Sequence, residues 1–69
     1  MRFDYSKLLG RMRERSFTQE KLAKYIGVSE STLNGKLTNK TYFNSKEIDR
    51  ICEALDISNE EIGAYFYTH

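Results

Sequence analysis

The sequence lacks several residue types on which whole classes of protein depend. It has no proline, no tryptophan and a single cysteine, Cys52. One cysteine cannot form an internal disulfide, and a structural zinc site needs several soft ligands at short spacing. No stretch approaches the ~20 apolar residues of a membrane helix, and Met1 is not followed by the apolar run of a signal peptide. We therefore expect a protein of a reducing cytoplasm, with no membrane association and no cofactor or metal.

Groups that perform catalysis are equally scarce. The only histidine is the last residue, His69, and the sequence has no paired acids and no glycine-rich loop for phosphate. General acid–base or nucleophilic chemistry needs such groups at defined positions. We therefore expect neither enzymatic activity nor a small-molecule ligand.

The length and composition favour one small helical domain. The chain has 69 residues, of which 39% are hydrophobic and 30% are charged. A domain of this size buries only ~60% of the surface that its unfolded chain exposes, so its core has to be compact. The absence of proline and the few glycines suit a helical bundle better than a turn-rich sandwich. Residues 1–69 are predicted to form a single domain.

Charge is divided unevenly along the chain. Residues 1–46 hold ten basic side chains against four acidic ones, a formal charge of +6, whereas residues 47–69 hold one basic against six acidic, a charge of −5. Such a division indicates one face turned towards a polyanion and another turned away, although solvated helix faces can also acquire it by chance. The near-neutral total is therefore compatible with DNA binding.

Five helix starts can be identified from their capping residues. In each, an apolar residue precedes a side chain that can cap a helix, and a second apolar residue follows at the position where a hydrophobic staple forms. Two starts also have a glutamate at the third helical position, which completes a capping box. The predicted caps are Asp4, Thr18, Ser29, Asn44 and Ser58, and the helices run roughly over residues 4–14, 18–26, 29–37, 44–55 and 58–67.

Apolar residues recur at helical spacing behind these caps. The first helix has them at Tyr5, Leu8, Leu9 and Met12, and the fourth has a similar stripe that contains Cys52. Residues spaced in this way lie on one face of a helix. Both stripes are predicted to face one core, with Cys52 as a small buried residue without a redox role.

The connection between the second and third helices has the features of a helix-turn-helix. Gly27 can adopt the positive φ that ends a helix, Val28 can fill the angle, and Ser29 can cap the next helix. Ala23 is small enough for the third helix to cross closely. Leu33 and Leu37 would then hold the third helix on the core and leave short polar side chains facing outwards.

The segment Thr18–Leu33 resembles the helix-turn-helix of lambda-repressor-like, Cro and xenobiotic-response-element-type regulators, and the resemblance extends over the whole chain. It is most specific at Gln19, Ala23, Gly27, Val28 and Leu33. The resemblance implies an all-α, compact five-helix lambda-repressor-like DNA-binding domain, with the helix-turn-helix at the second and third helices. It also implies a transcriptional repressor that binds double-stranded DNA sequence-specifically and is close to the small phage Cro-like proteins of a lysis–lysogeny switch. Such a protein is expected in the bacterial host cytoplasm, associated with the nucleoid.

In this family the third helix enters the major groove and the second lies across the DNA backbone. Base discrimination is accordingly assigned to side chains of the third helix, namely Glu30, Ser31, Thr32, Asn34 and Lys36. Gln19 matches the phosphate-contacting glutamine of the family. Phosphate contacts are assigned to Thr18, Gln19, Ser29, Asn39, Lys40 and Tyr42. Arg11, Arg13 and Arg15 either add attraction at longer range or serve solubility.

Several of these assignments have alternatives. Glu30 either contacts bases or only stabilises its helix dipole, and Tyr42 either contacts phosphate or packs on the core beside Phe43. Lys36 stands where the family pattern has an apolar residue. The neighbouring Gly35 either permits close approach to a groove or ends the helix early.

The aromatic C-terminal segment suggests a homodimer, because family members bind two half-sites through a symmetric pair. The predicted contact involves Ile57, Tyr65 and Phe66, which could instead close the core. A second function is also compatible with the sequence, since Glu30 and the acidic C-terminal part suit a protein-binding module. In that case the chain would be an antirepressor or an antitoxin-like protein that keeps the helix-turn-helix as a scaffold.

Overall fold

The computed structural model describes residues 2–67, and all the regular elements in that range are helices. Its elements are α1 (Ser6–Glu14), α2 (Gln19–Ile26), α3 (Glu30–Leu37), α4 (Ser45–Leu55), the short 3-10 helix η1 (Asn59–Glu61) and α5 (Ile62–Phe66). The predicted all-α, five-helix domain is confirmed, and the bounds of α2, α3 and α4 lie within one residue of their predicted positions. In the described range, no helix is long and apolar enough to cross a membrane.

Side-chain caps begin three of the helices as the sequence predicts. The Thr18 hydroxyl accepts from Lys21 N, the Ser29 hydroxyl from Thr32 N, and the Asn44 amide oxygen from Glu47 N. At Asn44 the capping box is complete, because the Glu47 carboxylate accepts from Asn44 N at 3.0 Å. These contacts satisfy backbone donors that a helix start leaves without partners.

The first and last helix starts differ from prediction. Asp4 does not occupy the cap position of α1, because Tyr5 does; the Asp4 carboxylate instead accepts from the backbone and hydroxyl of Ser6. The segment predicted as one helix over 58–67 begins as the 3-10 helix η1, closed by a hydrogen bond from Glu61 N to Ser58 O. The predicted Ser58–Glu61 pair is present, since the Glu61 carboxylate accepts from Ser58 N.

The core is built from the predicted stripes. Leu8, Ile51 and Leu55 are fully buried, whereas Cys52 is half-buried and packs against the core. Burial raises the pKa of the Cys52 thiol, which disfavours the reactive thiolate. Both members of each predicted hydrophobic staple also lie in the core or pack against it.

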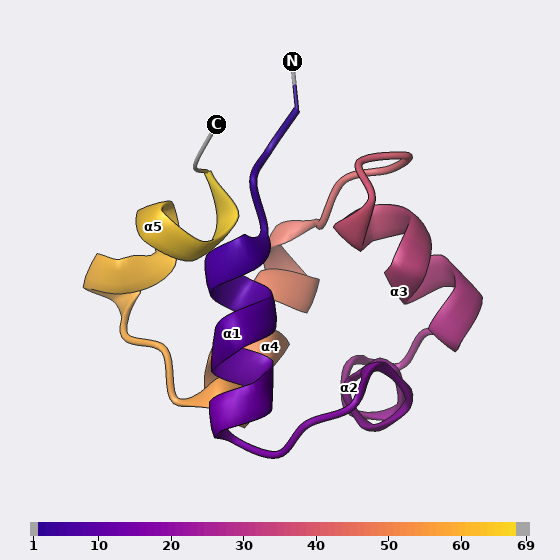
Figure 1. Ribbon diagram of the computed structural model, residues 1–69, viewed down its shortest axis with the longest axis horizontal. Helices are drawn as coiled ribbons and strands as arrows, with labels where there is room; N and C mark the ends of the chain where they lie inside the picture. The colour runs from indigo at the N-terminus through magenta and orange to yellow at the C-terminus, as the bar shows by residue number, and fades with distance from the viewer. Residues whose placement is uncertain (1, 68–69) are drawn as a thin grey trace.

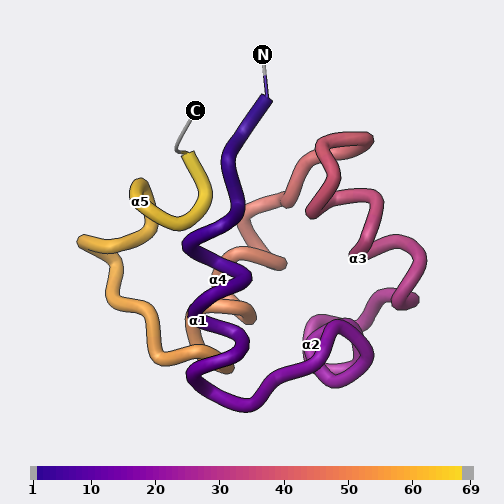
Figure 2. The backbone as a smooth tube through the Cα atoms, in the orientation of Figure 1, coloured from indigo at the N-terminus to yellow at the C-terminus, as the bar shows by residue number. Residues whose placement is uncertain are grey.

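The arrangement leaves one side of the molecule to the helix-turn-helix. In Figure 1, α1 runs through the middle, α5 lies to its left, and α2 and α3 lie together on the right. The chain trace shows α4 behind α1, and α2 packs against both α3 and α4 (Figure 2). Consequently α3 rests on the body of the protein through α2 and α4, with its other side facing solvent.

Candidate helix-turn-helix interface

The turn between α2 and α3 has the predicted construction. Gly27 adopts a left-handed backbone with φ 82°, and the N–H groups of Gly27 and Val28 both donate to Ala23 O, at 2.9 and 3.0 Å. Ala23 is 2% exposed, so its small side chain allows the close packing of the two helices. The helix-turn-helix at α2 and α3 is therefore confirmed.

The outward face of α3 carries short polar side chains. Leu33 and Leu37 are buried, whereas Glu30, Ser31 and Asn34 are exposed as predicted. Thr32 is also exposed, but its hydroxyl accepts from the Ser29 hydroxyl at 2.8 Å and thereby belongs to the helix cap. The side chains available for contact with a partner are thus chiefly those of Glu30, Ser31 and Asn34.

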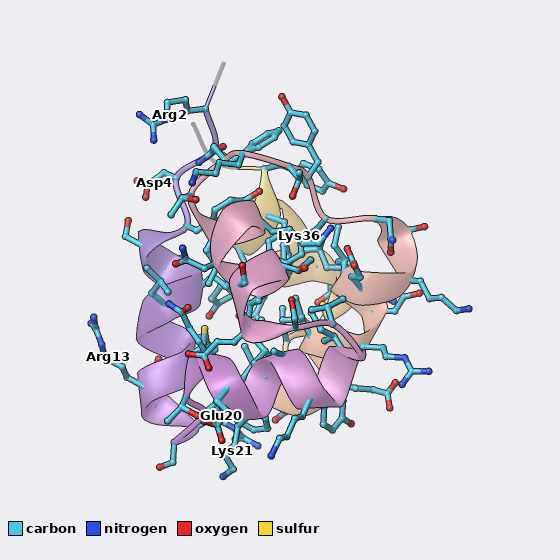
Figure 3. All side chains as sticks on the ribbon, turned by 90° about the vertical axis from the view of Figure 1, so that its right-hand side faces the viewer. Arg2, Asp4, Arg13, Glu20, Lys21 and Lys36 are labelled. Atoms are coloured by element: carbon cyan, nitrogen blue, oxygen red, sulfur yellow. The ribbon has the colours of Figure 1, made fainter. Side chains whose placement is uncertain are left out.

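Lys36 does not belong to this outward face, contrary to prediction. It is 9% exposed, and its ammonium group lies 3.0 Å from the Glu47 carboxylate of α4. The same group donates to Tyr42 O at 3.0 Å and lies over the Phe43 ring. Figure 3 shows Lys36 within the outline of the molecule, whereas Arg13 and Lys21 project from its edges.

The burial of Lys36 follows from helix geometry. Lys36 lies three residues after Leu33, on the same face of α3, at the position where the resembled family has an apolar residue. Its aliphatic stem can fill that position while the charge finds Glu47. The departure from the family pattern was therefore the sequence signal for a buried lysine.

Asn39 is also held within the fold, which corrects its assignment to phosphate. It adopts φ 68° after α3, and Asn39 N and Lys40 N donate back to Lys36 O and Gly35 O. Its side-chain amide makes two hydrogen bonds to the backbone of Phe3, accepting from Phe3 N at 2.7 Å and donating to Phe3 O at 2.9 Å. Asn39 thus fastens the N-terminal segment to the end of α3.

The remaining predicted contacts lie around the interface. Thr18, Ser29 and Lys40 are exposed, and Gln19 is half-buried at the first position of α2. Tyr42 is 64% exposed, with its ring in edge contact with the Phe3 ring. Of its two alternatives, packing inside the core is therefore excluded.

The predicted dimer contact lies inside the domain. Ile57 and Tyr65 are each 6% exposed and Phe66 is 2% exposed, so all three close the core of one chain. Their side chains are not available to a second subunit, which corrects the prediction that placed the contact there. The exposed aromatic residue of this segment is instead Tyr67.

Two structural features were not anticipated from the sequence. Arg11 donates to Leu55 O and Asp56 O, at 2.8 and 2.7 Å, and so binds the C-terminal end of α4. A cavity of about 300 Å3 also opens between the N-terminal segment, the loop after α3 and the C-terminal segment; its lining residues are Phe3, Tyr5, Tyr42, Phe43, Ile48, Phe66 and Tyr67. Burial raises the pKa of the Tyr5 hydroxyl. The aromatic residues of this cavity come from distant parts of the chain, so no local pattern reveals it.

Comparison with known proteins supports a phage regulatory relationship. No curated protein matches the sequence. The solution structure of the modulator of repression (MOR) of the temperate bacteriophage TP901-1 from Lactococcus lactis is 36% identical to this chain, with a TM-score of 0.80. The similarity covers 97% of this chain and 90% of that one.

A protein family matches over residues 1–69, and its description does not mention Cro or xenobiotic-response-element-type regulators. The phage relationship thus agrees with the sequence-based expectation, while the closer assignment to Cro-like repressors stays a prediction. The chain belongs to the family described as Protein of unknown function (DUF739).

Proposed function

We propose that this protein modulates repression in a phage genetic switch by binding the repressor protein through the turn and outward face of α3. The observation that supports a protein partner is the chemistry of this face. Its exposed side chains are the carboxylate of Glu30 and the uncharged groups of Ser31 and Asn34. The one lysine of α3, Lys36, is paired with Glu47 and buried.

A DNA-reading helix needs cations close to the phosphates, because the phosphate backbone supplies much of the affinity. Lys36 and Arg11 are committed to contacts within the fold, as is the side-chain amide of Asn39. Lys40, just beyond α3, is the exposed cation of the following loop, and Lys46 and Arg50 are exposed on α4 beside the turn. A surface with one acid and short neutral side chains is better suited to a protein, whose polar groups it can match without strong charge.

The structural neighbour is consistent with this proposal. That protein is described as a modulator of repression, and its similarity covers nearly all of this chain. A modulator acts on the outcome of repression, and contact with the repressor is the most direct physical means of doing so. The helix-turn-helix would then be a protein-binding surface on a scaffold shared with DNA-binding regulators.

The test is titration calorimetry of the full chain with the purified repressor of the same phage. Asn34→Arg places a bulky cation on the outward face of α3, and we expect it to weaken repressor binding at least tenfold. Asn59→Arg, at an exposed asparagine in η1, is the matched control and should bind normally. Equal affinities for the two variants would exclude the α3 face as the binding surface.

Operator DNA is the second candidate partner, and the helix-turn-helix architecture itself supports it. Thr18 and Ser29 cap two helix starts whose remaining N–H groups can face phosphate, and Lys40 lies exposed beyond α3. In that case the chain is a Cro-like repressor that binds its operator as a homodimer. Asn34→Ala should then alter discrimination between bases, whereas Lys40→Ala should weaken all sequences alike.

A salt titration separates the two candidates. Binding to operator DNA by the chain alone, with log affinity falling linearly against log salt, would favour the DNA-binding function. Repressor binding without DNA binding would favour the modulator function.

A further inference from the structure

A second surface lies where the helix-turn-helix meets the start of α4. A groove of about 320 Å3 runs between these elements. One side consists of Ile26, Gly27 and Val28, at the end of α2 and in the turn. The other side is formed by side chains from the beginning of α4, namely Asn44, Lys46, Glu47 and Arg50.

The charges in this groove do not cancel. The Glu47 carboxylate is already occupied, because it accepts from Asn44 N and pairs with Lys36. Lys46 and Arg50 are both exposed, and within residues 2–67 neither side chain forms an ion pair or a hydrogen bond. They lie four residues apart on α4, so their side chains are neighbours on the helix surface. The groove therefore presents two cations side by side, neither of them held in an ion pair within the described part of the chain.

The opposite side of the groove is apolar. Ile26 is 8% exposed and Val28 is half-buried, and Gly27 between them has no side chain. Ile26 belongs mainly to the core, so an occupant meets aliphatic surface chiefly at Val28 on one side and two positive charges on the other. A polypeptide segment with acidic and aliphatic side chains is complementary to both.

We propose that this groove binds an acidic, aliphatic-containing segment of the partner protein, with carboxylates bridging Lys46 and Arg50. Arg50 can hold a carboxylate through two parallel hydrogen bonds, and Lys46 adds a compact charge beside it. An aliphatic side chain of the segment would cover Val28 and the small exposed part of Ile26. Because Val28 leads directly into Ser29 and α3, one partner can occupy both the groove and the α3 face. The inference rests on the proposed function and specifies the chemistry of its partner.

A DNA phosphate is the competing occupant, and the structure favours it less. A phosphate would use the two cations but gain nothing from the aliphatic side of the groove. Glu47 also lines the groove and is an acceptor, which offers a phosphate no donor. A peptide carboxylate also finds no donor at Glu47, but the aliphatic side chains next to it in the peptide can contact the apolar side of the groove.

The test uses amide NMR spectra of the full chain, labelled with nitrogen-15. The probes are a short acetylated peptide of alternating glutamate and leucine, its glutamine-for-glutamate analogue, and inorganic phosphate. We expect the acidic peptide to give saturable shifts at residues 26–28 and 44–50, with affinity at least tenfold above that for the analogue. The double variant Lys46→Gln, Arg50→Gln should weaken this binding at least tenfold.

The matched control is Arg13→Gln, Arg15→Gln, which removes two exposed cations at the end of α1 and should leave peptide binding unchanged. Comparable affinity for the uncharged analogue, or the absence of saturable shifts in the groove, would overturn the proposal. Phosphate that saturates the same residues as tightly as the acidic peptide would also overturn it, in favour of a DNA-backbone site.

Failure of this proposal can be distinguished from failure of the proposed function. Asn34→Arg should weaken repressor binding at least tenfold while leaving the peptide site intact, because Asn34 lies on the outward face of α3. If the repressor binds the chain normally but the acidic peptide gives no saturable shifts in the groove, the modulator function stands and the groove inference fails. If the peptide binds the groove but the repressor does not bind the chain, the groove is a peptide-binding site and the modulator function fails.

Discussion

Lys36 and Glu47 form a mostly buried ion pair between α3 and α4. Their side chains are only 11% and 12% exposed, and their charged atoms lie 3.0 Å apart. Each has another contact: Glu47 accepts from Asn44 N at the start of α4, whereas Lys36 donates to Tyr42 O. A carboxylate near a helix N-terminus is stabilised there by the helix dipole. The charge of Glu47 is therefore better stabilised without Lys36 than the charge of Lys36 is without Glu47.

This difference predicts unequal effects of two substitutions. Glu47→Gln leaves Lys36 buried without its counter-charge, and we expect it to lower the free energy of unfolding by about 3 kcal/mol. Lys36→Met keeps the aliphatic stem in place and should lower it by about 1 kcal/mol, because Glu47 retains its cap contact. Urea unfolding at neutral pH measures both values.

The exposed pair of Lys24 and Glu20 provides the control. Its charged atoms lie 3.9 Å apart, with side chains 80% and 69% exposed. Glu20→Gln should change the free energy of unfolding by about 0.5 kcal/mol or less, since exposed ion pairs contribute little. Equal losses from Glu47→Gln and Lys36→Met would show that the two charges depend on one another symmetrically.

At the scale of the helices, the starts follow local patterns more closely than the ends. Thr18, Ser29 and Asn44 cap their helices through contacts within a few residues, which a sequence pattern contains. A residue with positive φ lies at or just after the ends of α1, α2, α3 and α4; only Gly27 of these is a glycine, and the others are Ser16, Asn39 and Asp56. Non-glycine residues adopt this conformation at some cost, so composition alone does not identify them.

Substitution of Gly35 shows whether this glycine lowers the stability of α3 in order to allow close contact with a partner. The helix continues through Gly35 to Leu37, so this glycine does not end it. A Cβ atom added here would lie 4.0 Å from Lys40 Cβ, which is an ordinary contact. We therefore expect Gly35→Ala to raise the free energy of unfolding by about 0.5–1 kcal/mol. If the repressor approaches the backbone closely at Gly35, the same substitution should weaken repressor binding.

Gly10 is the matched control for this prediction. It lies inside α1, where an added Cβ would meet nothing within 4 Å. Gly10→Ala should therefore give a similar gain in stability without a change in binding. Thermal unfolding and calorimetry with the repressor measure the two quantities. A stabilised Gly35→Ala variant with unaltered affinity would show that the partner does not approach this position closely.

For the whole molecule, the sequence was sufficient for the fold and insufficient for the binding surface. Five helix starts and two apolar stripes specified the elements and the core, because those signals are local and periodic. The roles of Lys36, Asn39 and Arg11 depend on contacts with Glu47, Phe3 and Leu55, respectively. These partners lie on other elements, and a side chain that appears exposed on an isolated helix is buried when they pack against it.

The same reasoning applies to the aromatic C-terminal segment. Its composition suggested a dimer contact, but in a domain this small a single large side chain can supply much of the core. Phe66 is 2% exposed and packs in edge contact with the Phe43 ring, with centroids 5.6 Å apart. Neighbouring Tyr67 is 55% exposed, so two adjacent aromatic residues have different surroundings.

Replacement of these two residues distinguishes a core role from a dimer role. Phe66→Ala should lower the free energy of unfolding by about 3–5 kcal/mol, because it removes a buried ring and leaves a cavity. Tyr67→Ala should lower it by no more than about 1 kcal/mol, since most surface substitutions have small effects. If Phe66 acts within one chain, the free energy of unfolding lost in Phe66→Ala should be the same at low and high micromolar protein concentration in urea unfolding. A midpoint that rises with concentration in the wild type, and ceases to do so in Phe66→Ala, would instead indicate a dimer that Phe66 helps to hold together.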